Sequence, residues 1–183
     1  MNLVEYKDVA LKRLNKTIFG DHKESMNYSC MGLIEETGEI IAELRKPLFK
    51  GNFHEKTLDI ENIKSELGDL IWYIALICKG YNINIEEIED TDNNKEDDLL
   101  PQREQIINVS IEMGQATGNI VEECKKNMEN KNESNIELIN KISEQYKNVT
   151  KLASLLDIAI EQILEENIKK INSRYTEKGD AIR

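Results

Sequence analysis

The segments GLIEETGEIIAELRK (residues 32–46) and ENIKSELGDLIWYIALIC (residues 61–78) have the residue spacing of two α-helices. Side chains three or four positions apart lie on the same face of a helix. The first segment predicts an amphipathic helix that ends before Pro47. Its apolar arc consists of Leu33, Ile34, Ile40, Ile41 and Leu44. The second is apolar on nearly every side after Asp69, which is typical of a buried helix.

The acidic residues of these segments form the patterns EExxE and ExxD, which are Glu35, Glu36 and Glu39, and Glu66 and Asp69. Glu66 and Asp69 project from the apolar helix, so we expect them to be partly buried. If the two helices turn these acids toward each other, each close pair repels by roughly 4 kcal/mol at an effective dielectric constant near 20. A hard divalent cation removes this repulsion, and oxygen ligands favour Mg²⁺ or Mn²⁺.

A solvated acidic helix face is the alternative interpretation, because Asp and Glu make up 35 of the 183 residues. The placement of Glu66 and Asp69 in an apolar helix argues against it, since buried carboxylates need a partner. Zinc is disfavoured because no His or Cys lies at ligand spacing. We therefore expect a cation site rather than a solvated surface.

The composition predicts an all-α helical bundle, because the chain has two prolines, nine glycines and little strand-type alternation. The net charge of −11 disfavours binding to nucleic acid polymers and to anionic membranes. The N-terminus is charged from the start, and the apolar run around Trp72 is too short to span a membrane. We expect a cytoplasmic protein in which Cys30, Cys78 and Cys124 are reduced thiols.

A faint internal repeat predicts how the rest of the chain is organised. ATGNIVEECKK (residues 116–126) resembles ETGEIIAELRK (residues 36–46), and SLLDIAIEQI (residues 154–163) resembles ELGDLIWYIA (residues 66–75). In the copy, only Asp157 keeps an acid of the first half. Chance similarity between amphipathic helices is the alternative.

The repeat suggests one all-α domain over residues 1–183, built around a four-helix core. The half that carries the metal site would occupy residues 1–90, followed by an acidic linker at 91–100. A degenerate second half with a basic C-terminal tail would occupy residues 101–183. The chain would then be a pseudo-dimer in which only one half keeps a functional metal site.

EExxE followed by ExxD, together with NIKKINSRY near the C-terminus, resembles the signature of the MazG-like, all-α nucleoside triphosphate pyrophosphohydrolases. The pseudo-dimer is similar to the dimeric dUTPase branch of that superfamily. The resemblance implies Mg²⁺-dependent hydrolysis of an NTP or dNTP between the α and β phosphates, which gives a monophosphate and pyrophosphate. It also implies assembly, and we expect a homodimer.

The resemblance implies roles for particular residues. Mg²⁺, with Mn²⁺ as a substitute, would be held by Glu36, Glu39, Glu66 and Asp69, and Glu35 or its neighbour Glu36 would accept the proton of the attacking water. Arg and Lys suit phosphate oxygens. The expected substrate-binding residues are Lys46, Tyr73, Asn167, Lys170, Arg174 and Tyr175.

Two other classes of protein are compatible with a helical bundle. A ferritin-like diiron protein needs Glu-x-x-His pairs, and neither His provides one. A non-catalytic interaction or nucleotide-binding module would carry the acids on its surface. It predicts no phosphate chemistry and tolerance of Asp69→Asn.

Overall fold

The computed structural model describes residues 1–13, 20–49, 57–88, 100–130 and 135–175. The helices are α1 (Leu3–Ala10), α2 (His22–Leu48), α3 (Ile60–Gly80), α4 (Gln102–Asn130), α5 (Ile136–Leu155) and α6 (Ile160–Arg174). Short 3₁₀ turns follow α1 at Leu11–Arg13 and α3 at Ile85–Glu87. The all-α prediction is confirmed for the described residues. Nearly all of the predicted linker at 91–100 lies outside them.

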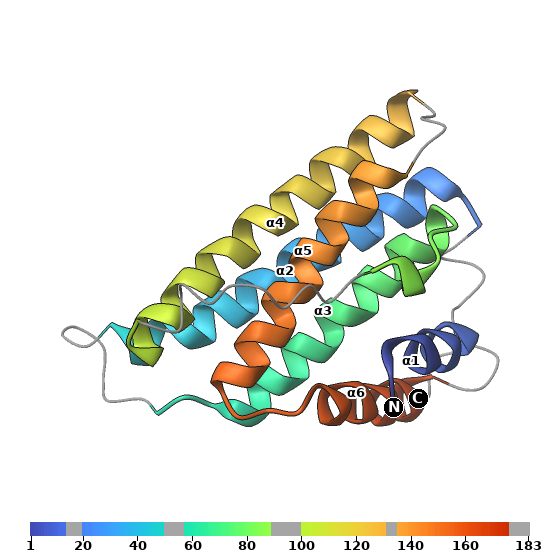
Figure 1. Ribbon diagram of the computed structural model, residues 1–183. Coiled ribbons are helices and arrows are strands. Elements are labelled where there is room, and N and C mark those ends of the chain that lie inside the picture. Colours follow the sequence, from blue (N-terminus) through green and yellow to red (C-terminus); the bar gives the residue numbers. More distant parts are fainter. Residues whose placement is uncertain (14–19, 50–56, 89–99, 131–134, 176–183) are drawn as a thin grey trace.

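Four helices form the core of the molecule, as predicted. α2 packs against α3 and α4, and α5 packs against α4 and α3 (Figure 1). The short helices α1 and α6 lie side by side at one flank of this bundle, where both contact α3. Helices α1 and α6 thus meet beside the helix that carries Glu66 and Asp69. None of the described helices is long and apolar enough to cross a membrane.

The helix boundaries follow from local capping. The side chain of Asp21 accepts a hydrogen bond from the Glu24 amide at 2.8 Å, and Asp59 accepts one from the Asn62 amide at 3.1 Å. The predicted end of α2 before Pro47 is wrong, because the helix continues to Leu48. A proline in the last turn removes only one backbone hydrogen bond there, so the helix tolerates it.

Helix α3 is the most buried element, as its apolar sequence predicts, and it provides most of one wall of the core. The expected apolar arc of α2 is correct for Leu33, Ile40 and Leu44, which are almost fully buried. It is wrong for Ile34, whose side chain is 51% exposed. The reason is that α2 packs against two neighbours, α3 and α4, and Ile34 lies on neither contact.

Helices α2 and α4 meet at corresponding positions of the predicted repeat. The hydroxyl oxygens of Thr37 and Thr117 are 2.8 Å apart, and these two residues are 80 positions apart in the chain, as the repeat requires. Cys30 lies against Cys124, so the helices run antiparallel. A contact between equivalent residues of two antiparallel helices is expected at a local two-fold axis.

The second part of the predicted repeat is wrong in register. Residues 154–163 run from the end of α5 through a turn into α6, and Asp157 adopts a left-handed conformation in that turn with φ 56°. One helix cannot include such a break. Helix α5 instead repeats the burial pattern of α3 at a separation of 78 residues: 145, 146, 148, 149, 152 and 153 correspond to 67, 68, 70, 71, 74 and 75.

In the corrected register, most of the second-half positions that match the acids of the first half are occupied by other residue types. Ala116 and Asn119 replace two glutamates of α2, and Glu144 and Lys147 replace the ExxD pair of α3. These last two residues carry one negative and one positive charge, whereas the matching pair in α3 carries two negative charges. The second half therefore has the helical packing of the first without its concentration of negative charge.

Candidate metal and substrate site

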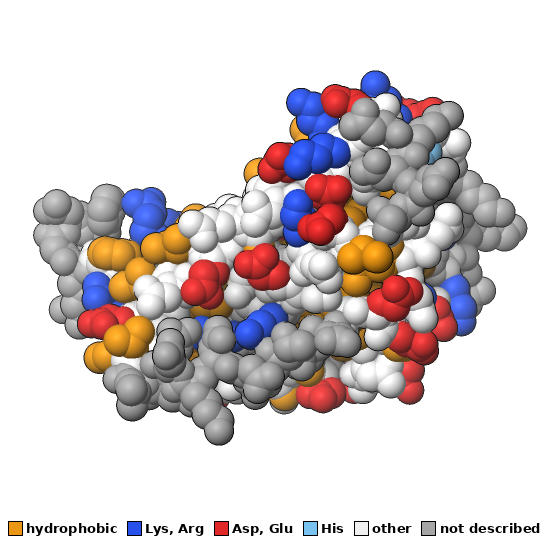
Figure 2. Space-filling view, turned by 45° about the horizontal axis from the view of Figure 1, so that its top comes forward, with side chains coloured by type: hydrophobic (Ala, Val, Ile, Leu, Met, Phe, Trp, Pro, Cys, Tyr) orange, Lys and Arg blue, Asp and Glu red, His pale blue; other side chains and the backbone are white. Residues whose placement is uncertain are grey.

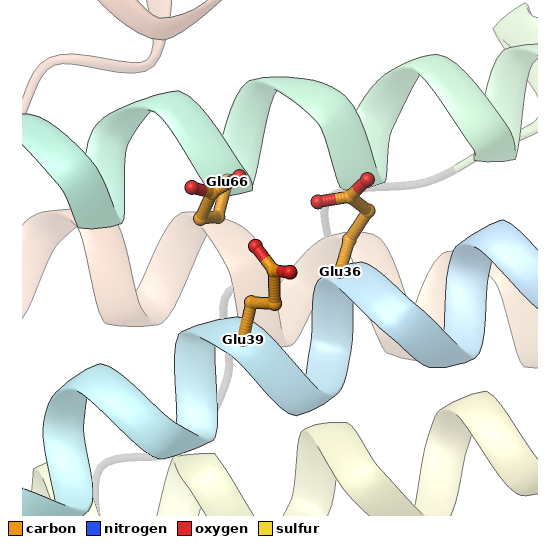
Figure 3. Close-up of side chains that lie close together, drawn as sticks. All are labelled: Glu36, Glu39 and Glu66. Atoms are coloured by element: carbon orange, nitrogen blue, oxygen red, sulfur yellow. The ribbon is translucent and has the colours of Figure 1, made fainter.

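Three carboxylates from two helices converge between α2 and α3. Glu36 and Glu39 come from α2 and Glu66 comes from α3, and each contributes an oxygen that lies within 4.8 Å of the others (Figure 3). Glu36 and Glu39 reach the same place because they are three residues apart on one helix face. The close packing of α2 on α3 brings Glu66 opposite them.

Burial and mutual repulsion raise the pKa values of two carboxyl groups in this cluster. The pKa of Glu36 is raised to about 8, first by loss of solvent, then by the charges of Asp69, Glu66 and Glu39 and by a hydrogen bond with Glu66. Burial also raises the pKa of Glu66, while the ammonium of Lys170 opposes that rise. Near neutral pH, a proton between Glu36 and Glu66 therefore relieves part of the repulsion.

Asp69 lies beside this cluster and is held from its other side by α6. Its carboxylate forms an ion pair with Lys170 and accepts a hydrogen bond from the Asn167 amide at 2.7 Å. The Lys170 ammonium also donates to the Ser65 hydroxyl at 2.8 Å. Two of the predicted substrate-binding residues thus contact a predicted metal ligand in the protein itself.

A residue from the start of the chain completes this network. The Tyr6 hydroxyl donates a hydrogen bond to the Asn167 side-chain oxygen at 2.6 Å, and both side chains are buried. With its oxygen engaged by Tyr6, the Asn167 amide group is oriented to donate to Asp69. The sequence offers no signal for the role of Tyr6, because 161 positions separate it from Asn167.

An aromatic wall lies next to the acids. The Tyr73 ring is 6.0 Å from Tyr28 and 4.9 Å from Trp72, and Tyr28 is 40% exposed. Burial and a hydrogen bond with Tyr28 raise the pKa of Tyr73. Tyr73 packs directly on Gly32, where an added Cβ would come within 2.1 Å of the ring. Sequence reasoning missed Tyr28 and Gly32.

Comparison with known proteins finds a family model that matches the part of the chain with these acids. Residues 25–103 match the MazG nucleotide pyrophosphohydrolase domain, and the match includes both helices that carry the acids. The match supports a MazG-like, all-α superfamily for this segment. The matched segment covers less than half of the chain, and α5 and α6 lie outside it.

The chain is also similar to the Gene 37 protein of Mycobacterium phage L5. The two are 28% identical over 75 residues, which make up 41% of this chain and 66% of the phage protein. The chain therefore matches just under two thirds of that relative's length. No solved structure matches the chain.

The remaining predicted site residues lie outside the group formed by the three glutamates. Glu35 is exposed and lies outside the group of converging oxygens. Lys46 pairs with Glu43 at 3.2 Å, near the end of α2. Arg174 is exposed one turn beyond Lys170, and Tyr175 follows it with a backbone hydrogen bond to Ile171 at 3.0 Å.

Proposed function

We propose that this protein hydrolyses a nucleoside triphosphate, either an NTP or a dNTP, between its α and β phosphates and releases a monophosphate and pyrophosphate. The three converging carboxylates on α2 and α3, within the segment that matches the MazG domain, carry this proposal. Its biological role would be removal of unwanted nucleotides, and dUTP is a plausible substrate.

The chemistry of the cluster fits a hard divalent cation. Its donors are carboxylate oxygens within 4.8 Å of one another, and burial together with the charges of the neighbouring acids raises the pKa of Glu36. Glu36, Glu39 and Glu66 would hold Mg²⁺, or Mn²⁺ as a substitute, with Asp69 beside them. When bound, such an ion neutralises phosphate charge and lowers the pKa of bound water.

The protein's own residues would position the substrate and move a proton. Lys170 lies at Asp69, where its ammonium would turn from the carboxylate to a phosphate oxygen while the buried Asn167 keeps its contact with Asp69. Arg174 lies one turn further on the same helix. The exposed Glu35, next to the cluster in the chain, would accept the proton of the attacking water. The wall formed by Tyr73 and Tyr28 would face the base.

The rest of the chain supports this site in our proposal. Residues 1–90 carry the acids, and residues 101–183 complete the bundle and add the α6 network, within one domain. We propose that the protein acts in the cytoplasm as a homodimer on free nucleotides rather than on nucleic acid polymers. Tyr175 and Lys46 are retained as outer contacts of the triphosphate.

Product analysis tests the proposal. The protein is incubated with a panel of NTPs and dNTPs and Mg²⁺, and pyrophosphate is separated from orthophosphate. We expect pyrophosphate and monophosphate, with loss of both upon chelation and in Glu66→Gln and Asp69→Asn. Glu104→Gln is the matched control, because Glu104 is an exposed acid on α4 that does not belong to the acid cluster.

Two results would contradict the proposal. Release of orthophosphate would show a different bond cleavage. Absence of turnover for every nucleotide, by protein with an unchanged circular dichroism spectrum, would instead favour a binding module on this scaffold.

A further inference from the structure

Two cysteines face each other across the α2 and α4 pair. Cys30 of α2 and Cys124 of α4 are each seven residues from the hydrogen-bonded pair of Thr37 and Thr117. Because α2 and α4 run antiparallel (Figure 1), two turns backward along α2 and two turns forward along α4 lead to the same level of the pair. The register that joins the threonines therefore also brings the cysteines together.

The two thiol groups are in contact. The Cys124 thiol donates a hydrogen bond to the Cys30 sulfur, and both side chains are buried. The hydroxyl oxygens of Thr37 and Thr117, which are 2.8 Å apart, show how closely the two helices approach each other nearby. A disulfide joins Cβ atoms that are about 4 Å apart, so two thiols in hydrogen-bond contact need only a small side-chain movement to form one.

A groove beside Cys30 gives small molecules access to this pair of thiols. The groove has a volume of about 560 Å³, and Cys30 belongs to its lining together with Met31 and Ile34 of α2 and Val121 of α4. Cys30 is 6% exposed, whereas Cys124 is fully buried and does not belong to the described lining. A reagent in the groove therefore reaches the Cys30 sulfur first.

Charged residues line the same groove. Lys23 and Lys125 provide two ammonium groups, and Glu129 provides one carboxylate. Figure 2 shows that charged side chains of both signs gather at the upper right, the end at which α4 stops in Figure 1. A disulfide compound that carries both carboxylates and amines, such as oxidised glutathione, complements these charges.

The cysteine thiols differ in acidity. The hydrogen bond from Cys124 lowers the pKa of Cys30, and burial opposes this effect. The same hydrogen bond and burial raise the pKa of Cys124. Burial raises the pKa of Cys78 on α3 to about 12, so that thiol stays protonated near neutral pH. Cys30 thus has the properties of an attacking thiol, and Cys124 is placed to resolve a mixed disulfide.

We propose that Cys30 and Cys124 form a reversible disulfide when a small-molecule disulfide such as oxidised glutathione enters the groove. The Cys30 thiolate attacks one sulfur of the reagent, whose S–S bond breaks and releases one glutathione. Cys124 then loses its proton and attacks the Cys30 sulfur of the mixed disulfide, which releases the second glutathione. The two cysteines lose two electrons and two protons, and the two glutathione molecules receive them.

The disulfide would fasten α2, the helix that carries Glu36 and Glu39, to α4 of the second half. It would join two positions that are 94 residues apart, so it would strongly restrict the unfolded chain. All three cysteines are free in the structure. The reaction depends only on the fold and stands apart from the proposed hydrolysis.

Reaction of the folded, reduced full chain with oxidised glutathione tests this proposal. Mass spectrometry of tryptic peptides prepared without reduction should show Cys30 joined to Cys124, with Cys78 free. The oxidised protein should melt at a temperature roughly 10 °C above that of the reduced protein. Cys78→Ala is the matched control, because it removes the third buried cysteine, and it should form the same disulfide.

Alanine variants separate the roles of the two thiols. Cys124→Ala should retain glutathione on Cys30, because no second thiol resolves the mixed disulfide, whereas Cys30→Ala should leave Cys124 unmodified. Iodoacetamide labelling of the wild type, which does not depend on the folding of a variant, should modify Cys30 before Cys124 and Cys78. Retention of all three thiols, a disulfide through Cys78, glutathione on Cys124, or equal labelling of the three cysteines would overturn the proposal.

Discussion

Replacing Glu36 by Gln should stabilise the metal-free protein at high pH. A carboxyl group with a pKa of about 8 in the folded state and 4.5 ordinarily binds more protons when folded than when unfolded. The wild-type free energy of unfolding must then fall as the pH rises from about 4.5 to about 8. Gln resembles the protonated side chain, so the variant does not lose this stability.

The size of the effect follows from the cluster geometry. Two ionised carboxylates whose oxygens lie 4.8 Å apart repel by roughly 3.5 kcal/mol at an effective dielectric constant near 20. Glu39 is exposed, and solvent reduces this figure to about 2 kcal/mol. We expect Glu36→Gln to raise the free energy of unfolding by about 2 kcal/mol near pH 9 and to leave it nearly unchanged near pH 4, below the ordinary pKa of the carboxyl group.

Urea unfolding followed by circular dichroism, with a chelator present, measures this difference at both pH values. Glu35→Gln is the matched control, because its side chain is exposed and outside the cluster, and it should show little change at either pH. Adding Mg²⁺ near pH 9 should stabilise the wild type more than Glu36→Gln. A variant change of equal size at both pH values, or a loss of stability near pH 9, would refute the reasoning.

Two further substitutions test the packing and the network around the site. Gly32→Ala should lower the free energy of unfolding by about 1–3 kcal/mol in chemical denaturation, because its Cβ would overlap the Tyr73 ring. Gly38→Ala on the same helix is the control and should be neutral or stabilising. Equal effects of the two substitutions would contradict the described packing. Lys170→Met should lower the free energy of unfolding by about 2 kcal/mol without metal, because Asp69 loses its paired ammonium. Millimolar Mg²⁺ should restore part of this stability in thermal melts. A substitution without effect on stability would show that the ion pair is unimportant.

The sequence was sufficient to predict the convergence of the glutamates, because that depends on local rules. Spacing places Glu36 and Glu39 on one helix face, and the apolar character of α3 predicts that Glu66 is partly buried. Two consecutive helices joined by a short connection usually pack against each other. These steps involve only neighbouring elements of the chain.

The contacts around Asp69 could not be predicted from the sequence. Its partners Lys170 and Asn167 are 101 and 98 positions away, and no local pattern distinguishes pairing with a carboxylate from binding to a phosphate. The register error in the second half has a similar origin. A shared aspartate suggested that Asp157 matches Asp69, but the helix breaks at Asp157, and burial over the length of α5 gives the correct match.

The network through Tyr6, Asn167 and Asp69 has a consequence for synthesis of the protein. Tyr6 belongs to α1 and Asn167 to α6, which is translated much later, and α1 packs against α6. While α6 is still being translated, the nascent chain can form the α2 and α3 pair with its repelling acids but not the contacts that hold Asp69. The site is therefore completed only after α6 has been translated, and until then a bound cation would be the available source of compensating charge.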